Sequence, residues 1–118
     1  MIAQVHTGCI DGVEALLVQV EVALTTALPA FSVVGLAQGS VREGRERVAA
    51  ALRASGHPLP PRRITVNLAP ADVRKVGTAF DLPIAVGILA AAGVVPVEHL
   101  RSAAFLGEVG LDGRLRPV

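Results

Sequence analysis

Apolar and polar residues alternate along the first two dozen positions of the chain. Within residues 13–24, leucine or valine stands at every second position from Leu16 to Leu24, which predicts a strand with one apolar face. Residues 2–9 follow a similar pattern, and the Asp11-Gly12 pair between the two runs is typical of a hairpin turn. Two more strands are expected over residues 30–36 and 62–69.

The spacing of apolar residues changes to three or four after position 40. Ser40 and Glu43 have the spacing of a capping box, in which a hydroxyl and a carboxylate accept hydrogen bonds from the first N–H groups of a helix. Val48 and Leu52 share one stripe behind them. Gly56 is expected to end this helix in a left-handed conformation, because the prolines that follow cannot continue it.

A second helix is expected over residues 82–92, with Asp81 as its N-cap and Gly93 just beyond its end. This helix is apolar nearly all round, which predicts burial on more than one side. Residues 103–111 then read as a strand, and an Asp-Gly turn leads into a returning strand over residues 114–118.

The expected elements follow the order βββαβαββ. This order favours an α/β fold of the α+β sandwich type, in which a mixed sheet carries its helices on one face. A chain of 118 residues is one domain by size. The N-terminus lacks the basic region of a signal peptide, and proline and glycine interrupt the longest apolar stretch, residues 82–97. We therefore expect a soluble, cytoplasmic domain.

Composition and charge narrow the classes of function. Hydrophobic residues make up 52% of the chain and charged residues 18%, which disfavours intrinsic disorder. The net charge of +1 carries no general signature of polyanion binding, and without Trp or Tyr the chain has no platform for base stacking. Cys9 is the only cysteine, so neither an intramolecular disulfide nor a zinc site with two cysteines can form.

Two kinds of binding site are disfavoured by residue spacing. Residues 35–40 form a glycine-containing turn, but they lack the lysine and the spacing of a Walker P-loop. An anion at this helix start is an open alternative, although a simple turn explains the glycines better. His6 and Cys9 have a spacing seen among metal ligands, but on a strand they point to opposite faces. No metal site is therefore expected.

A serine–lysine pair is the remaining route to catalysis. Lys75 is the only lysine, so it is the only amine that could act as the base. No serine lies in a strained, glycine-flanked turn of the nucleophile-elbow type. Catalysis by this chain alone is therefore not expected. The serines in question are Ser32, Ser40, Ser55 and Ser102.

Basic side chains gather in two places. The first group lies on the first expected helix, where pairs with glutamates four residues away indicate a solvated face. Its members are Arg42, Arg45, Arg47 and Arg53. The second group brackets the strand 62–69 and the loop after it, and is the candidate polar contact surface for phosphate or for a partner's carboxylates. It consists of Arg62, Arg63, Arg74 and Lys75, and an ordinary solvated surface is the favoured alternative for it.

Three segments in a fixed order carry a family resemblance. They are residues 63–72 (RITVNLAPAD), 80–85 (FDLPIA) and 105–118 (FLGEVGLDGRLRPV). Together they resemble the N-terminal domain of the bacterial magnesium-chelatase-like AAA+ ATPases of the ComM type. The resemblance covers essentially the whole chain, including residues 40–47.

The resemblance implies a Lon-protease-like fold, which is also similar to the second domain of certain ribosomal proteins. In Lon, the nucleophilic serine lies in a turn before a buried helix. The matching turn is residues 77–81, which places Ala79 where the serine would lie, and the Lon lysine would fall beyond Val118. The resemblance therefore implies this scaffold without proteolytic chemistry.

The resemblance also implies a longer parent protein. In this family an ATPase module with Walker motifs follows the domain, so ATP and Mg²⁺ are expected in that module and no cofactor is expected in this chain. The parent is expected to be a ring-forming, DNA-acting motor linked to branch migration in natural transformation. Residues 1–118 are then a single Lon-like domain, truncated at its C-terminal end.

The expected role of this domain is non-catalytic. It would serve assembly or contact with a partner or DNA, and its expected partners are the other subunits of a homo-oligomeric ring and, through the parent, DNA, but no membrane. Two alternatives stay open. One is a degenerate Lon-like serine peptidase, and the other is a module that binds a small molecule or an anion at the loop over residues 70–81.

Overall fold

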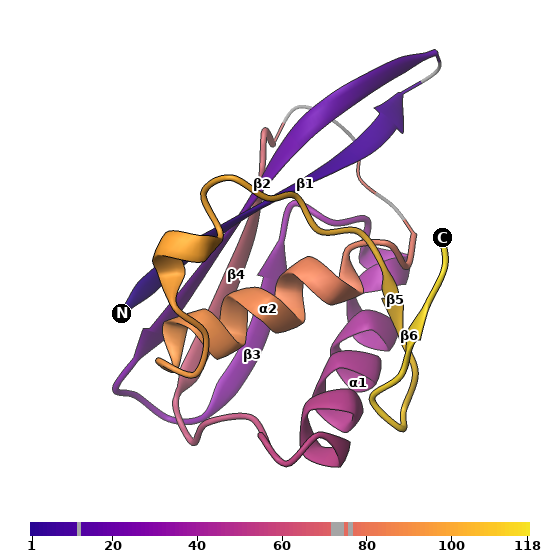
Figure 1. Cartoon of the computed structure of the whole chain (residues 1–118). Coiled ribbons are helices and arrows are strands. Elements are labelled where there is room, and N and C mark those ends of the chain that lie inside the picture. Colours follow the sequence, from indigo (N-terminus) through magenta and orange to yellow (C-terminus); the bar gives the residue numbers. More distant parts are fainter. Residues whose placement is uncertain (12, 72–74, 76) are drawn as a thin grey trace.

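Four strands form one sheet in the computed structural model, and two helices lie on one of its faces (Figure 1). The structure describes residues 1–11, 13–71, 75 and 77–118. The elements in chain order are β1 (Ile2–Asp11), β2 (Glu14–Thr25), β3 (Ala30–Val34), α1 (Gln38–Ala54), β4 (Arg63–Ala69), α2 (Asp81–Ala91), the short 3-10 helix η1 (Val97–His99), β5 (Glu108–Val109) and β6 (Leu115–Arg116).

The sheet has the strand order β1-β2-β4-β3. The pairs β1–β2 and β2–β4 are antiparallel, and β3 pairs with β4 in parallel. The expectation of a mixed α/β fold with a mixed sheet is therefore confirmed. The turn at Gly12 lies outside the described residues.

The last two strands differ from the expectation. β5 and β6 form a separate two-stranded sheet, and the expected strand over residues 103–111 is wrong for most of its length. Near its middle, the N–H and C=O groups of Gly107 bond to Ala79 and Leu82 at the start of α2, and these bonds take the place of a strand partner. Only Ala104 bridges to the sheet, in parallel with His6 of β1.

Side-chain alternation gives the sheet one apolar and one polar face. Val5, Val20 and Leu68 stand side by side on three neighbouring strands, and all three are fully buried. Hydrogen bonds between polar side chains cross the opposite face: Gln19 donates to Gln4 at 3.0 Å, and Asn67 donates to Glu21 at 3.1 Å. The helices cover the apolar face, as the strand patterns predict.

The helix α2 crosses β1 and β2 and is almost entirely enclosed (Figure 1). Eight of its eleven residues are buried, which confirms the expectation from its apolar composition. Gly87 allows this close approach, because a Cβ atom there would lie 2.6 Å from Cγ2 of Val22. Among the described residues, no helix is both long and apolar enough to cross a lipid bilayer.

The predicted helix ends are right at the C-termini and wrong at the N-termini. Gly56 and Gly93 follow α1 and α2 with φ angles of 83° and 82°, as expected for glycine at this position. However, α1 begins with Ala37 as its N-cap, so Ser40 lies inside the helix and forms no capping box. Asp81 is the first residue of α2, follows the N-cap Phe80, and makes no cap hydrogen bond. Its carboxylate instead accepts hydrogen bonds from Arg47 of α1.

We predict that Gly87→Ala lowers the free energy of unfolding by about 1–2 kcal/mol, because Val22 is stiff and cannot yield easily to the added methyl group. Gly39→Ala is the matched control in α1, since no atom lies within 4 Å of a Cβ there. It should leave stability unchanged or raise it by up to about 1 kcal/mol. Urea unfolding followed by circular dichroism measures both changes. Equal stability of the two variants would contradict the close packing of α2.

Candidate functional site

Ala79 lies directly before Phe80, the N-cap of α2, at the point where α2 meets the segment around residue 107. The Gly107 N–H donates to the Ala79 carbonyl at 3.0 Å, and the Leu82 N–H donates to the Gly107 carbonyl at 2.9 Å. The Asp81 N–H donates to Thr78 at 3.1 Å, which closes the turn. The side chain at position 79 is a methyl group, which can neither attack a carbonyl nor transfer a proton.

The start of α2 offers few donors to an anion. The first N–H groups of a helix are usually free to bind one. Here those of Asp81 and Leu82 already donate to protein carbonyls, and Pro83 has no N–H. The Asp81 carboxylate adds negative charge at the same place. This arrangement argues against an anion-binding module at the start of α2.

A bidentate ion pair joins α2 to α1. Nε of Arg47 donates to Oδ2 of Asp81 at 2.6 Å, and NH2 of Arg47 donates to Oδ1 at 3.1 Å. The Asp81 side chain is 3% exposed and that of Arg47 is 19% exposed. The N–H of Val109 in β5 also donates to Oδ2 of Asp81, at 3.4 Å. One carboxylate thus connects α1, α2 and β5.

The ion pair with Asp81 determines both the pKa and the orientation of the Arg47 side chain. The hydrogen bond to Asp81 raises the pKa of the Arg47 guanidinium above its ordinary value, although burial acts in the opposite direction. Arg47 was expected on a solvated helix face, and this expectation is wrong because its side chain turns inward to Asp81. No local spacing could reveal the pair, since 34 residues separate its members.

An apolar cleft of about 460 Å³ lies between the β1–β2 hairpin and the start of α2. Among the described residues that line it, no side chain is charged and the Cys9 thiol is the only polar one. A cleft of this composition can hold an apolar group. Sequence reasoning did not find this cleft, because its walls come from distant segments. They are Gly8, Cys9, Ile10, Ala15, Leu16, Ala79, Phe80, Leu106 and Val118.

The candidate polar contact surface is not brought together by the fold. Arg62 and Arg63 are exposed at the start of β4, whereas Lys75 contacts Pro70 just beyond the other end of this seven-residue strand, which spans about 20 Å. Lys75 is only 1% exposed, and its ammonium group donates to the carbonyl of Pro70. Its inclusion in an exposed surface is therefore a mistake. Arg74 lies outside the described residues.

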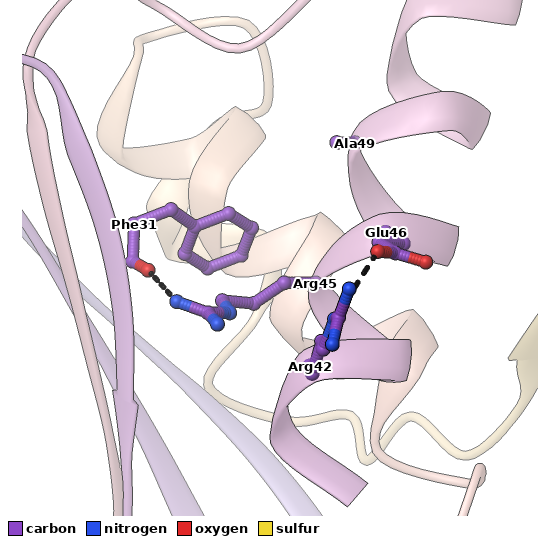
Figure 2. A pocket seen from close by; sticks show the side chains of 5 residues that line it. All are labelled: Phe31, Arg42, Arg45, Glu46 and Ala49. Atoms are coloured by element: carbon purple, nitrogen blue, oxygen red, sulfur yellow. Dashed lines mark hydrogen bonds and ion pairs between the residues drawn. The ribbon is translucent and has the colours of Figure 1, made fainter.

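Arg42 and Arg45, two members of the first basic group, border a shallow pocket of about 390 Å³ beside α1 (Figure 2). Arg45 reaches across to β3 and donates to the carbonyl of Phe31 at 2.7 Å. Arg42 pairs with Glu46 at 3.7 Å, which confirms the expected pair between residues four apart. Both guanidinium groups are thus engaged within the protein.

The potential metal and thiol ligands are dispersed. His6 and Cys9 occupy opposite faces of β1, as their spacing predicts, because Cys9 packs against the core and His6 belongs to the other set of alternating positions. Over the ranges 1–11, 13–71 and 77–118 and at residue 75, no three His, Cys, Asp or Glu side chains gather in a way that could hold a metal ion.

Comparison of the sequence with known proteins assigns the chain to a family. The sequence model described as subunit ChlI of Mg-chelatase matches residues 20–118, most of the chain. The chain belongs to this Mg-chelatase-like family. Its sequence is 46% identical over 117 residues to the competence protein ComM of Haemophilus influenzae. It is also 43% identical over 117 residues to the uncharacterized protein YifB of Salmonella typhimurium, and 43% identical over 114 residues to YifB of Escherichia coli.

These alignments cover nearly all of the Mg-chelatase-like chain but a small part of its relatives. They include 97–99% of this chain and 22–23% of the relatives. The chain therefore spans less than a quarter of the length of the curated relatives that it matches. The resemblance to ComM-type proteins inferred from the sequence motifs is confirmed at the level of the family.

We predict that Asp81→Asn lowers the free energy of unfolding by about 2 kcal/mol, because it leaves the partly buried Arg47 cation without its carboxylate. Glu46→Gln is the control, since it removes an exposed ion pair on α1, the helix that carries Arg47, and should cost less than about 0.5 kcal/mol. Thermal unfolding compares the two. Similar losses for both variants would show that the Arg47–Asp81 pair contributes no more than a surface pair.

Proposed function

We propose that this chain is a non-catalytic contact domain of a longer, magnesium-chelatase-like ATPase. The observation that carries the proposal is the exposed apolar tip of the β1–β2 hairpin. The strand β2 pairs with β4 only from Gln19 onward, so the hairpin extends beyond the rest of the sheet (Figure 1). Ile10, Val13 and Leu17 on this extension are 79%, 101% and 71% exposed. Apolar side chains gathered at such a position are typical of an interaction site.

The activity of the parent protein is part of the same proposal. Its ATPase module would bind ATP and Mg²⁺ outside this chain, and its subunits would form a ring in which the hairpin contacts a neighbour or another partner. The Haemophilus influenzae relative is named a competence protein. This name supports a role for the parent protein in handling DNA during natural transformation. Arg62 and Arg63 remain exposed and available for a polar contact.

A Lon-like fold is also proposed for this chain, and with it the absence of peptidase chemistry. The alanine at position 79, next to the N-cap of the buried helix α2, supports this view, because a methyl group cannot act as a nucleophile. The apolar lining of the cleft beside Ala79 supports it as well. No observation favours the degenerate peptidase.

The full-length protein tests the contact role. We predict that the double substitution Ile10→Ser and Val13→Ser weakens ring assembly or partner and DNA binding by about tenfold, because it removes apolar area from the hairpin. Sedimentation velocity and DNA-binding titration measure the two effects. Leu28→Ser is the control, since Leu28 is equally exposed but lies in the loop before β3.

Deletion of residues 1–118 should produce the same loss in a stronger form. If the deleted protein assembles and binds DNA and its other partners as the intact one does, the contact role is wrong. Hydrolysis of a fluorogenic peptide by the intact protein, lost on serine substitution, would instead favour the peptidase.

A further inference from the structure

The ladder between β1 and β2 determines which backbone groups of β1 face outward. Met1 and Leu24 exchange two hydrogen bonds, of 3.0 Å and 2.9 Å. In an antiparallel pair such exchanges recur at every second residue, so the odd-numbered residues of β1 bond to β2. The even-numbered residues therefore point their N–H and C=O groups away from the sheet. β1 is an edge strand, so these groups line its open side.

One part of this edge is already used by the protein. The Phe105 N–H donates to the carbonyl of His6 at 2.9 Å, and Ala104 pairs with His6 in parallel. The chain then turns away, because Gly107 bonds to the start of α2. Beyond that turn, no strand or backbone group of the described residues pairs with the outward sides of Gly8 and Ile10.

The apolar cleft opens at this unused stretch of edge. Gly8, Cys9 and Ile10 form one wall of the cleft, and Phe80 and Leu106 lie on other sides. Cys9 is on the face of β1 that packs toward the core. In neighbouring strands, residues opposite each other point to the same face of the sheet. A strand placed beside Gly8 and Ile10 would therefore direct the side chain opposite Cys9 into the cleft.

We propose that this edge and cleft bind an extended peptide segment by strand addition, with one apolar side chain in the cleft. The inference rests on the proposed contact function and names the chemistry of the partner. Two observations select this occupant. The outward N–H and C=O groups of Gly8 and Ile10 match an extended backbone and continue the pairing that residues 104–105 begin. The described side chains of the lining are uncharged, so the cleft complements an uncharged side chain.

The probe is the peptide acetyl-Ser-Thr-Leu-Thr-Ser-amide, titrated into the isotopically labelled 118-residue chain and followed by the amide NMR signals. Saturable shifts are expected at Gly8, Ile10, Leu16 and Leu106 below 1 mM peptide. Aspartate in place of the central leucine should weaken binding at least tenfold, because the cleft would have to desolvate a charge. Absence of binding at 1 mM, or equal binding of the two peptides, overturns the proposal.

Backbone methylation separates strand addition from simple apolar binding. In an antiparallel arrangement the threonines on both sides of the leucine donate to β1, and in a parallel one the leucine itself donates. One peptide is therefore N-methylated at both threonines and another at the leucine. Loss of binding by at least tenfold for one of them supports strand addition and gives its direction. Unchanged binding of both peptides overturns it.

Substitutions in the protein locate the site. Ile10→Pro removes an outward N–H that β2 does not use, and Ile10→Thr keeps it, so only the proline variant should lose binding by about tenfold. Leu106→Asp should abolish binding, while Leu111→Asp, at another exposed leucine outside the cleft, should not. The amide spectrum of each variant confirms that it is folded. Equal binding by Leu106→Asp and Leu111→Asp overturns the assignment of the cleft.

Self-association is a separate outcome. If the same amide signals shift with protein concentration alone, a second copy of the chain occupies the edge and the peptide proposal is wrong. If no peptide binds but deletion of residues 1–118 still disrupts assembly of the full-length protein, only this inference fails. The contact function then stands.

Discussion

The arrangement of this domain depends on the hydrogen bonds that the buried carboxylate of Asp81 accepts. It accepts two hydrogen bonds from Arg47 of α1 and one from the backbone of β5, at the first turn of the helix that crosses the sheet. A carboxylate with 3% exposure would be costly without such partners. With them, it sets the position of α2 relative to α1 and to the segment that follows residue 107.

The same junction shapes the surface near the helix start. Because the N–H groups of Asp81 and Leu82 donate to the carbonyls of Thr78 and Gly107, these donors, which often bind an anion or stabilise an oxyanion, are occupied. The side chain before the helix is the methyl group of Ala79, and the neighbouring cleft is apolar. The surface beside the start of α2 is therefore suited to holding an apolar group. The β1–β2 hairpin beside the cleft also carries exposed apolar side chains.

Local patterns predicted most of the fold correctly. Alternation identified β1, β2 and β4, and composition identified β3 and the burial of α2. These patterns depend on which side of an element faces water. The prediction of a glycine after each helix was also correct, because the positive φ angle that ends a helix is a local property that glycine adopts easily. The capping roles of Ser40 and Asp81 were wrong. Both predictions assumed that a polar side chain near a helix start bonds to its own helix, and for Asp81 a partner from elsewhere in the chain took precedence.

The sequence by itself determined the two faces of the sheet, the ends of the helices at Gly56 and Gly93, and, through its motifs, the family. Only the tertiary structure decided that Arg47 turns inward, that Lys75 is buried away from Arg62 and Arg63, and that a cleft lies beside an unused strand edge. The physical reason is the distance along the chain. Periodicity reports which side of an element is apolar, but ion pairs, clefts and shared surfaces depend on which distant segments the fold brings together.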